Sequence, residues 1–264
     1  MDSSISLHSD SFSWRRVMQV ASFYSVVTTR QLIIYALASL VFAFLILIPA
    51  HEYIQVGLFT MIWTSIGLMM QLAPVVLAKS GDSRIIERLI PASAAEKLTF
   101  FLIYFWLVIP FVCYFLPEIS LILYKAIPFL QTSQMLELID LHHTPNATSL
   151  LMNIFNSLGA ATTCLYVVMK VKRNRVLWGI VSVFVFNFIL GIIGAVNGFI
   201  TVFNMGIEDG SAGYPMNNAQ ASQWAMDFIS ELQPVFVTIT CLLAIYLAWM
   251  CYKTYRLLNN STSS

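Results

Sequence analysis

Charged residues are scarce in this sequence. Asp, Glu, Lys and Arg make up only 10% of its 264 residues, whereas hydrophobic residues make up 58%. Soluble domains carry about 25% charged and about 45–50% apolar residues, so a soluble fold would lack the polar groups to cover such a core. Because the apolar residues also occur in long runs, the composition predicts an all-α, polytopic integral membrane protein.

An excess of charge of either sign is also missing. The chain has 14 Lys and Arg against 13 Asp and Glu, a net charge of +1. It therefore lacks the basic surface that neutralises nucleic-acid phosphates, and we expect no nucleic-acid partner. Cysteine is rare as well. The four cysteines fall inside apolar runs, which predicts neither a disulfide framework nor a cysteine metal site; they are Cys113, Cys164, Cys241 and Cys251.

The motifs of enzymes and energised carriers are absent. The sequence contains no G-x-x-x-x-G-K-[ST], no H-E-x-x-H and no G-x-S-x-G. Its long apolar runs hold no carboxylate or histidine, which an intramembrane hydrolase or an ion-coupled carrier needs. The neighbouring His142 and His143, close to Asp140, have no third ligand nearby and do not by themselves predict a metal site. We expect neither enzymatic activity nor a cofactor, and any transport would draw its energy from another protein.

Six apolar runs are long enough to cross a bilayer, which requires roughly 17–25 residues and more if the helix is tilted. The predicted spans are residues 32–49, 54–77, 98–116, 150–169, 176–203 and 235–252. They divide the chain into a cytoplasmic N-terminal segment (1–30), a six-span transmembrane domain (31–252) and a short cytoplasmic tail (253–264).

The basic residues predict the orientation of these spans. If the N-terminus is cytoplasmic, every Lys and Arg except Lys125 falls in a cytoplasmic segment. Such a bias is typical of the cytoplasmic side of membrane proteins. We therefore expect both termini in the cytoplasm and a multi-pass protein of the cell inner membrane.

The segment before the first span has a helical pattern of its own. Four apolar residues recur there at helical spacing, with the arginines Arg15 and Arg16 at other positions; they are Trp14, Val17, Met18 and Ala21. This pattern indicates an amphipathic helix that lies at the cytoplasmic interface of the membrane. The alternative is a plain cytoplasmic extension of the first span.

The cytoplasmic loop between the second and third spans contains the richest local pattern. It has an apolar set (Ile85, Ile86, Leu89 and Ile90) and a charged set (Arg84, Glu87 and Arg88), as in a short amphipathic helix. Pro91 ends this helix, because the residue before a proline disfavours helical angles. Ser93 and Glu96 then match the S-x-x-E capping box, which predicts the start of the third span.

Two stripes of small and polar residues lie within the spans. One consists of Asn153, Ser157, Ala160 and Cys164, and the other of Asn187, Gly191, Gly194 and Gly198. In membranes, stripes of this kind favour close contact between helices. A role in lining a substrate pathway is the alternative.

Residues 88–97, R-L-I-P-A-S-A-A-E-K, resemble the L-P-[AV]-S-x-x-E-K stretch between the second and third spans of type-2 ABC exporter permeases. The similarity is greatest to the bacterial branch of uncharacterised, permease-like members, with Ile90 in place of the usual leucine. The resemblance implies a separate P-loop ATPase subunit that docks on this loop, and a second permease subunit, identical or homologous. It implies coupling roles for Arg84, Glu87, Arg88, Leu89 and Pro91, with Ser93, Glu96 and Lys97 at the base of the third span.

The function expected from this resemblance is a permease-like subunit of an ABC-type exporter with an unknown substrate. The alternative is an integral membrane scaffold, sensor or immunity-type protein that transports nothing and uses the same six helices. An intramembrane lipid enzyme is a third interpretation, and no catalytic group supports it. A neighbouring reading frame for a P-loop ATPase without spans of its own would favour transport over the scaffold.

Overall fold

In the computed structural model, the described residues are 12–46, 52–79, 92–116, 119, 147–209 and 218–262. Every element among them is helical. Six are α-helices, one is a 3-10 helix (η1) and two are π-helical segments (η2 and η3). Their bounds are α1 Trp14–Ile46, α2 Glu52–Leu72, η1 Ala73–Lys79, α4 Ala94–Ile103, η2 Tyr104–Val108, η3 Phe111–Phe115, α7 Ala147–Lys170, α8 Arg175–Asp209 and α9 Asn218–Thr262.

Five helical stretches of the described chain are long and apolar enough to cross a membrane. They are Trp14–Phe42, Ala94–Cys113, Met152–Lys170, Arg175–Thr201 and Leu232–Asn260. The described apolar part of the predicted second span, Thr64–Leu77, is shorter. The structure is thus that of an all-helical chain compatible with a multi-pass membrane protein, and the sixth span stays a prediction.

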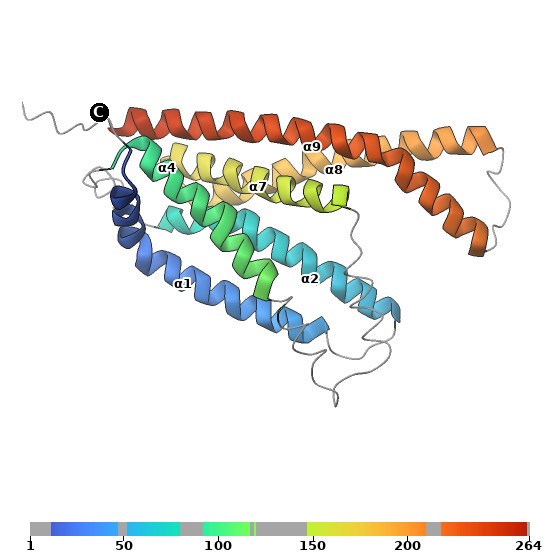
Figure 1. Cartoon of the computed structure of the whole chain (residues 1–264), viewed down its shortest axis with the longest axis horizontal. Helices are drawn as coiled ribbons and strands as arrows, with labels where there is room; N and C mark the ends of the chain where they lie inside the picture. Colours follow the sequence, from blue (N-terminus) through green and yellow to red (C-terminus); the bar gives the residue numbers. More distant parts are fainter. Residues whose placement is uncertain are drawn as a thin grey trace, which may run out of the picture.

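The N-terminal segment does not form a separate helix. Residues 14–46 are one continuous helix, α1, whose first turns stand at an angle to the rest (dark blue in Figure 1). Val17 is buried here, as are Val20 and Tyr24, whereas Trp14 and Met18 are exposed. The buried face of this segment therefore differs from the predicted apolar face, because contact with neighbouring helices decides which side turns inward.

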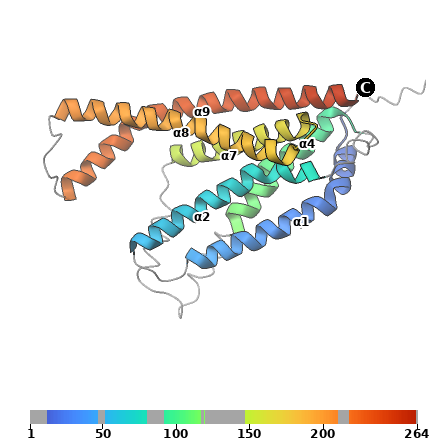
Figure 2. The ribbon, with the colours of Figure 1, turned by 180° about the vertical axis from the view of Figure 1, so that it is seen from behind.

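The helices lie alongside one another, and the predicted cytoplasmic ends gather at one end of the molecule. The starts of α1 and α4, the end of α7 and the end of α9 all lie at the left in Figure 1, and at the right when the molecule is seen from behind (Figure 2). Helix α7 contacts α2, η1, α8 and α9, while α1 contacts α2, α4 and η3. Helix α9 contains Pro234, and it bends along its length (Figure 1), as expected where proline removes a helical hydrogen bond.

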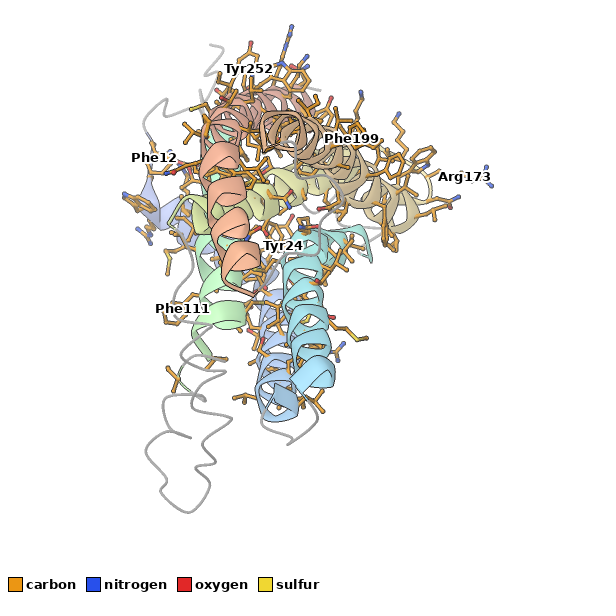
Figure 3. The ribbon with its side chains drawn as sticks, turned by 90° about the vertical axis from the view of Figure 1, so that its right-hand side faces the viewer. Phe12, Tyr24, Phe111, Arg173, Phe199 and Tyr252 are labelled. Atoms are coloured by element: carbon orange, nitrogen blue, oxygen red, sulfur yellow. The ribbon has the colours of Figure 1, made fainter. Side chains whose placement is uncertain are left out.

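Aromatic and aliphatic side chains from several helices form the buried core. Tyr24 of α1 stacks on Phe100 of α4 with ring centroids 5.6 Å apart, and Phe100 stacks on Tyr104 at 6.0 Å. Figure 3 shows Tyr24 inside the bundle, and Phe111 and Phe199 on its outside. Phe199 is 72% exposed. Large apolar side chains on the outer surface are expected where lipid replaces water as the solvent.

Candidate functional site

Helix α4 begins with the capping box that the sequence predicts. Ser93 is the N-cap residue, and its hydroxyl accepts a hydrogen bond from the Glu96 N–H at 3.3 Å. In return, the Ser93 N–H donates to Glu96 Oε2 at 2.8 Å. Two backbone donors that a helix start leaves without partners are thereby satisfied. The prediction of a capped helix start at this position is confirmed.

The same carboxylate also binds the start of α1. The Ser13 N–H donates to Glu96 Oε1 at 2.7 Å, and Arg16 Nε lies 2.9 and 3.0 Å from the two carboxylate oxygens. A second guanidinium nitrogen of Arg16 lies 2.8 Å from Oε1. The Glu96 side chain is fully buried, whereas that of Arg16 is 26% exposed. We call Ser13, Arg16, Ser93 and Glu96 the Glu96 cluster; it joins the first turns of α1 and α4.

A second group of polar contacts joins α1 to the end of α2 and the start of η1. Gln31 Nε2 donates to the Ala73 carbonyl at 2.9 Å, and the Tyr35 hydroxyl donates to the Met69 carbonyl at 2.9 Å. The chain changes at Ala73 from α-helix to 3-10 helix, and Pro74 has no N–H to donate. The two side chains of α1 donate to carbonyl oxygens on either side of this junction.

Two residues of α1, Thr28 and Gln31, also bind Tyr104, the first residue of η2, which directly follows α4. The Tyr104 hydroxyl lies 3.1 Å from the Thr28 carbonyl and 3.1 Å from Gln31 Oε1, so its proton has two acceptors. Thr28, Gln31 and Tyr104 are all buried. Buried polar groups are costly unless they are hydrogen-bonded, so these bonds hold α1, η1 and η2 in one arrangement. We call Thr28, Gln31, Tyr35 and Tyr104 the Gln31 cluster.

The two clusters flank one segment of the chain, residues 80–91. Because the family resemblance implies coupling roles for residues of this segment, we call it the coupling loop. The loop leaves η1, which the Gln31 cluster binds, and enters α4, which the Glu96 cluster binds. Both clusters attach to α1. Five of the coupling residues implied by the family resemblance lie in this loop, outside the described residues; they are Arg84, Glu87, Arg88, Leu89 and Pro91.

The other three predicted coupling residues are described, and they lie at the start of α4. Glu96 is fully buried and Lys97 is 6% exposed, whereas Ser93 lies at the surface. The carboxylate of Glu96 faces α1 and not solvent. Glu96 and Lys97 therefore offer little surface to a partner protein. The contacts of Glu96 with α1 suit it instead to hold the coupling loop in position.

The predicted stripe on α8 divides into two parts. Asn187 points inward, where its Nδ2 donates to Gln71 Oε1 of α2 at 2.6 Å and to the Val183 carbonyl at 2.9 Å. At Gly191, Gly194 and Gly198 an added Cβ would meet no atom within 4 Å. Within the described chain these glycines make no close helix contact. The expected packing role is therefore not seen there, because this face of α8 points away from the other helices.

Neighbouring helices approach each other closely at two other glycines. A Cβ at Gly179 would lie 2.8 Å from Val168 Cγ2 of α7 and 3.1 Å from Val75 Cγ2 of η1. At Gly159 of α7 it would lie 2.8 Å from Phe186 Cζ of α8. In the first predicted stripe, Ser157, Ala160 and Cys164 are buried while Asn153 is exposed, so most of that stripe packs as expected.

Sequence reasoning missed the residues that hold the site together. Gln31 precedes the first predicted span by one residue, and the pairing of Arg16 with Glu96 joins positions 80 residues apart. A signal for the Gln31 cluster does exist, because Thr28, Gln31 and Tyr35 recur at helical spacing beside an apolar run. The pair His142 and His143 lies outside the described residues, and no group of metal-binding side chains occurs within the described part.

Comparison of this chain with known protein families, with curated proteins and with solved structures finds no match.

Proposed function

We propose that this chain is the membrane subunit of an ABC-type exporter of the type-2 class, which works with a separate P-loop ATPase and a second permease subunit. In this proposal the chain crosses the cell inner membrane six times, with both termini in the cytoplasm. Helix α2 and η1 together form the second span, and the first turns of α1 lie at the cytoplasmic interface.

One observation carries the proposal: both flanks of the coupling loop are attached to α1. A short amphipathic helix can dock in a groove of a partner protein. To transmit movement from that partner, the loop must be connected firmly to the spans, since a freely hinged loop would absorb the displacement. The Glu96 cluster makes such a connection on the α4 side, and the Gln31 cluster makes one on the η1 side.

The first experiment tests the partner. The tagged chain is purified from its native membrane in mild detergent, and co-purifying P-loop ATPases are identified by mass spectrometry. A variant with Glu87→Arg, Arg88→Glu and Leu89→Asp loses the charged and apolar docking contacts together, since exposed ion pairs alone contribute only about 0–1 kcal/mol. We expect this variant to insert into the membrane normally, and we expect no ATPase to co-purify with it. If the triple variant retains the ATPase at wild-type levels, the coupling role of the loop is wrong.

The second experiment separates coupling from docking. Arg16→Ala removes the ion pair between α1 and α4 but leaves the docking residues in place. We expect the ATPase to co-purify normally while its stimulation by the membrane subunit falls. Arg15→Ala is the matched control, because Arg15 is adjacent in sequence and exposed. Equal ATPase stimulation in the two variants would argue against the Glu96 cluster as the coupling link.

A further inference from the structure

The turn between α7 and α8 concentrates positive charge at the surface. Four cations occur within six residues of this basic turn (residues 170–175): Lys170, Lys172, Arg173 and Arg175. Asn174 adopts a left-handed conformation with φ of 54°, which asparagine tolerates better than most residues and which allows a tight reversal. The chain thus returns into α8 within a few residues and holds the cations close together.

Among the described residues, no carboxylate neutralises the cations of the basic turn. None of the four has a carboxylate within ion-pair distance in the part of the chain that the structure describes. Lys170 Nζ instead lies over the ring of Tyr166, 5.4 Å from its centroid. Figure 3 shows Arg173 at the outer edge of the bundle, with its side chain pointing away from the helices. The charge of the basic turn is therefore directed outward, toward whatever surrounds the bundle.

Along α8, the exposed side chains that follow the basic turn become less polar, as a bilayer does from its surface inward. Trp178, three residues after Arg175, is 51% exposed, and Phe184 is 58% exposed. With a rise of 1.5 Å per residue, Trp178 lies about 4.5 Å and Phe184 about 13 Å deeper along the helix than Arg175. The cations are thus followed by exposed apolar and aromatic side chains, from Val176 and Leu177 onward, as headgroups are followed by the interface and the hydrocarbon.

Helix α9 repeats this order at the same end of the molecule. Lys253 Nζ lies over the ring of Trp249, 5.3 Å from its centroid, and Trp249 is 51% exposed. Arg256 is also exposed, without a carboxylate partner among the described residues. Figures 1 and 2 both place the end of α9 and the α7–α8 junction at one end of the bundle. Two separate elements thus present cations beside an exposed tryptophan near the same end of the bundle.

We propose that the basic turn binds the phosphate groups of anionic phospholipids. Charge complementarity identifies the ligand class, since cations near an anionic lipid surface are attracted to it. The depth order along α8 favours lipid over a docked protein, because the exposed apolar residues directly beyond the turn require hydrocarbon around them. This inference needs only that the chain is inserted in a membrane, and it does not depend on the proposed transport function.

The test uses the full chain, purified in mild detergent and stripped of lipid. Phosphatidylglycerol and phosphatidylcholine with identical acyl chains are titrated separately, and bound lipid is counted by native mass spectrometry. The neutral variant carries Lys170→Gln, Lys172→Gln, Arg173→Gln and Arg175→Gln. The matched control keeps every charge: Lys170→Arg, Lys172→Arg, Arg173→Lys and Arg175→Lys.

We expect the wild type and the charge-preserving control to bind phosphatidylglycerol in preference to phosphatidylcholine. Each cation near an anionic surface is worth a factor of about five in affinity, so the neutral variant should bind phosphatidylglycerol at least about tenfold more weakly, with phosphatidylcholine unchanged. The wild-type preference should also fall as ionic strength rises from about 0.1 M to about 1 M, because the screening length shortens from about 10 Å to about 3 Å. This salt series provides a test even if the neutral variant fails to fold.

Several outcomes would overturn the proposal. The charges do not bind the lipid if the neutral variant still prefers phosphatidylglycerol to phosphatidylcholine as the wild type does. The same conclusion follows if the charge-preserving control loses this preference as fully as the neutral variant does. A neutral variant that retains its lipids but loses a co-purifying protein would identify the turn as a protein-docking surface instead. Competition by inorganic phosphate as strong as that by the lipid would indicate a site for free phosphate.

Discussion

Replacing Gly179 by a larger residue tests how α8 packs against α7 and η1. A Cβ at position 179 would lie 2.8 Å from Val168 Cγ2 and 3.1 Å from Val75 Cγ2, whereas carbon atoms in contact are normally about 3.5–4.0 Å apart. Both neighbours are β-branched and have few alternative rotamers. The helices must therefore move apart to accept even one methyl group.

The size of the effect follows from two opposing contributions. Overpacking a filled contact costs about 1–3 kcal/mol, and replacing glycine by alanine within a helix recovers about 1 kcal/mol. Gly179→Ala should therefore lower the free energy of unfolding by about 0–2 kcal/mol. Gly179→Leu places three further carbons in the same contact, and we expect a loss of about 3 kcal/mol or more. Gly194→Leu enters open space and should cost nothing in packing.

The assay is thermal or denaturant unfolding of the purified chain in one mild detergent, followed by tryptophan fluorescence, with Gly194→Leu as the matched control. We expect the order of stability to be wild type and Gly194→Leu above Gly179→Ala, and Gly179→Leu lowest. A Gly194→Leu variant that loses as much stability as Gly179→Leu would refute the reasoning. Some helix would then have to lie over the outer face of α8, and a changed oligomeric state of Gly194→Leu with Gly198→Leu would identify a second subunit there.

Three further predictions concern single features of the chain. Gln31→Leu removes the donor to the Ala73 carbonyl and one acceptor of Tyr104, so we expect a loss of about 1–3 kcal/mol in unfolding free energy, with Gln31→Glu as a variant that retains the acceptor. Ser93→Ala removes the cap of α4 and should cost about 1 kcal/mol in the same assay; an unchanged stability would mean that the cap contributes nothing. Reporter fusions at Asn174 should indicate the cytoplasm and those at residue 213 the outside, and an exterior signal from Asn174 contradicts the six-span topology.

The features that sequence reasoning recovered are those set by neighbours along the chain. Apolar runs of sufficient length specify helices because backbone groups in lipid must be bonded internally, and five helical stretches of the described chain meet the criteria of length and apolarity. The capping box at Ser93 and Glu96 is equally local. Its partners are three residues apart, and the geometry of one helical turn brings them within hydrogen-bonding distance.

The other contacts of Glu96 are not specified by local sequence patterns. Its sequence context places it at the base of a span, and its side chain is fully buried against Arg16 and Ser13. That contact exists because α1 and α4 pack against each other, and no local pattern at either position specifies this packing. The continuous α1 is a related case, since its buried face is selected by contact with α4 and not by its own periodicity.

The glycines of α8 separate what the sequence determined from what the tertiary structure decided. Composition and spacing alone determined that residues 176–203 form an apolar helix with a glycine stripe. Only the fold decided that Gly179 is the point of close contact while Gly191, Gly194 and Gly198 face outward. The physical reason is that lipid chains and neighbouring helices are similarly apolar. Hydrophobicity therefore does not specify the rotation of a spanning helix about its axis, and side-chain packing against α7 and η1 does.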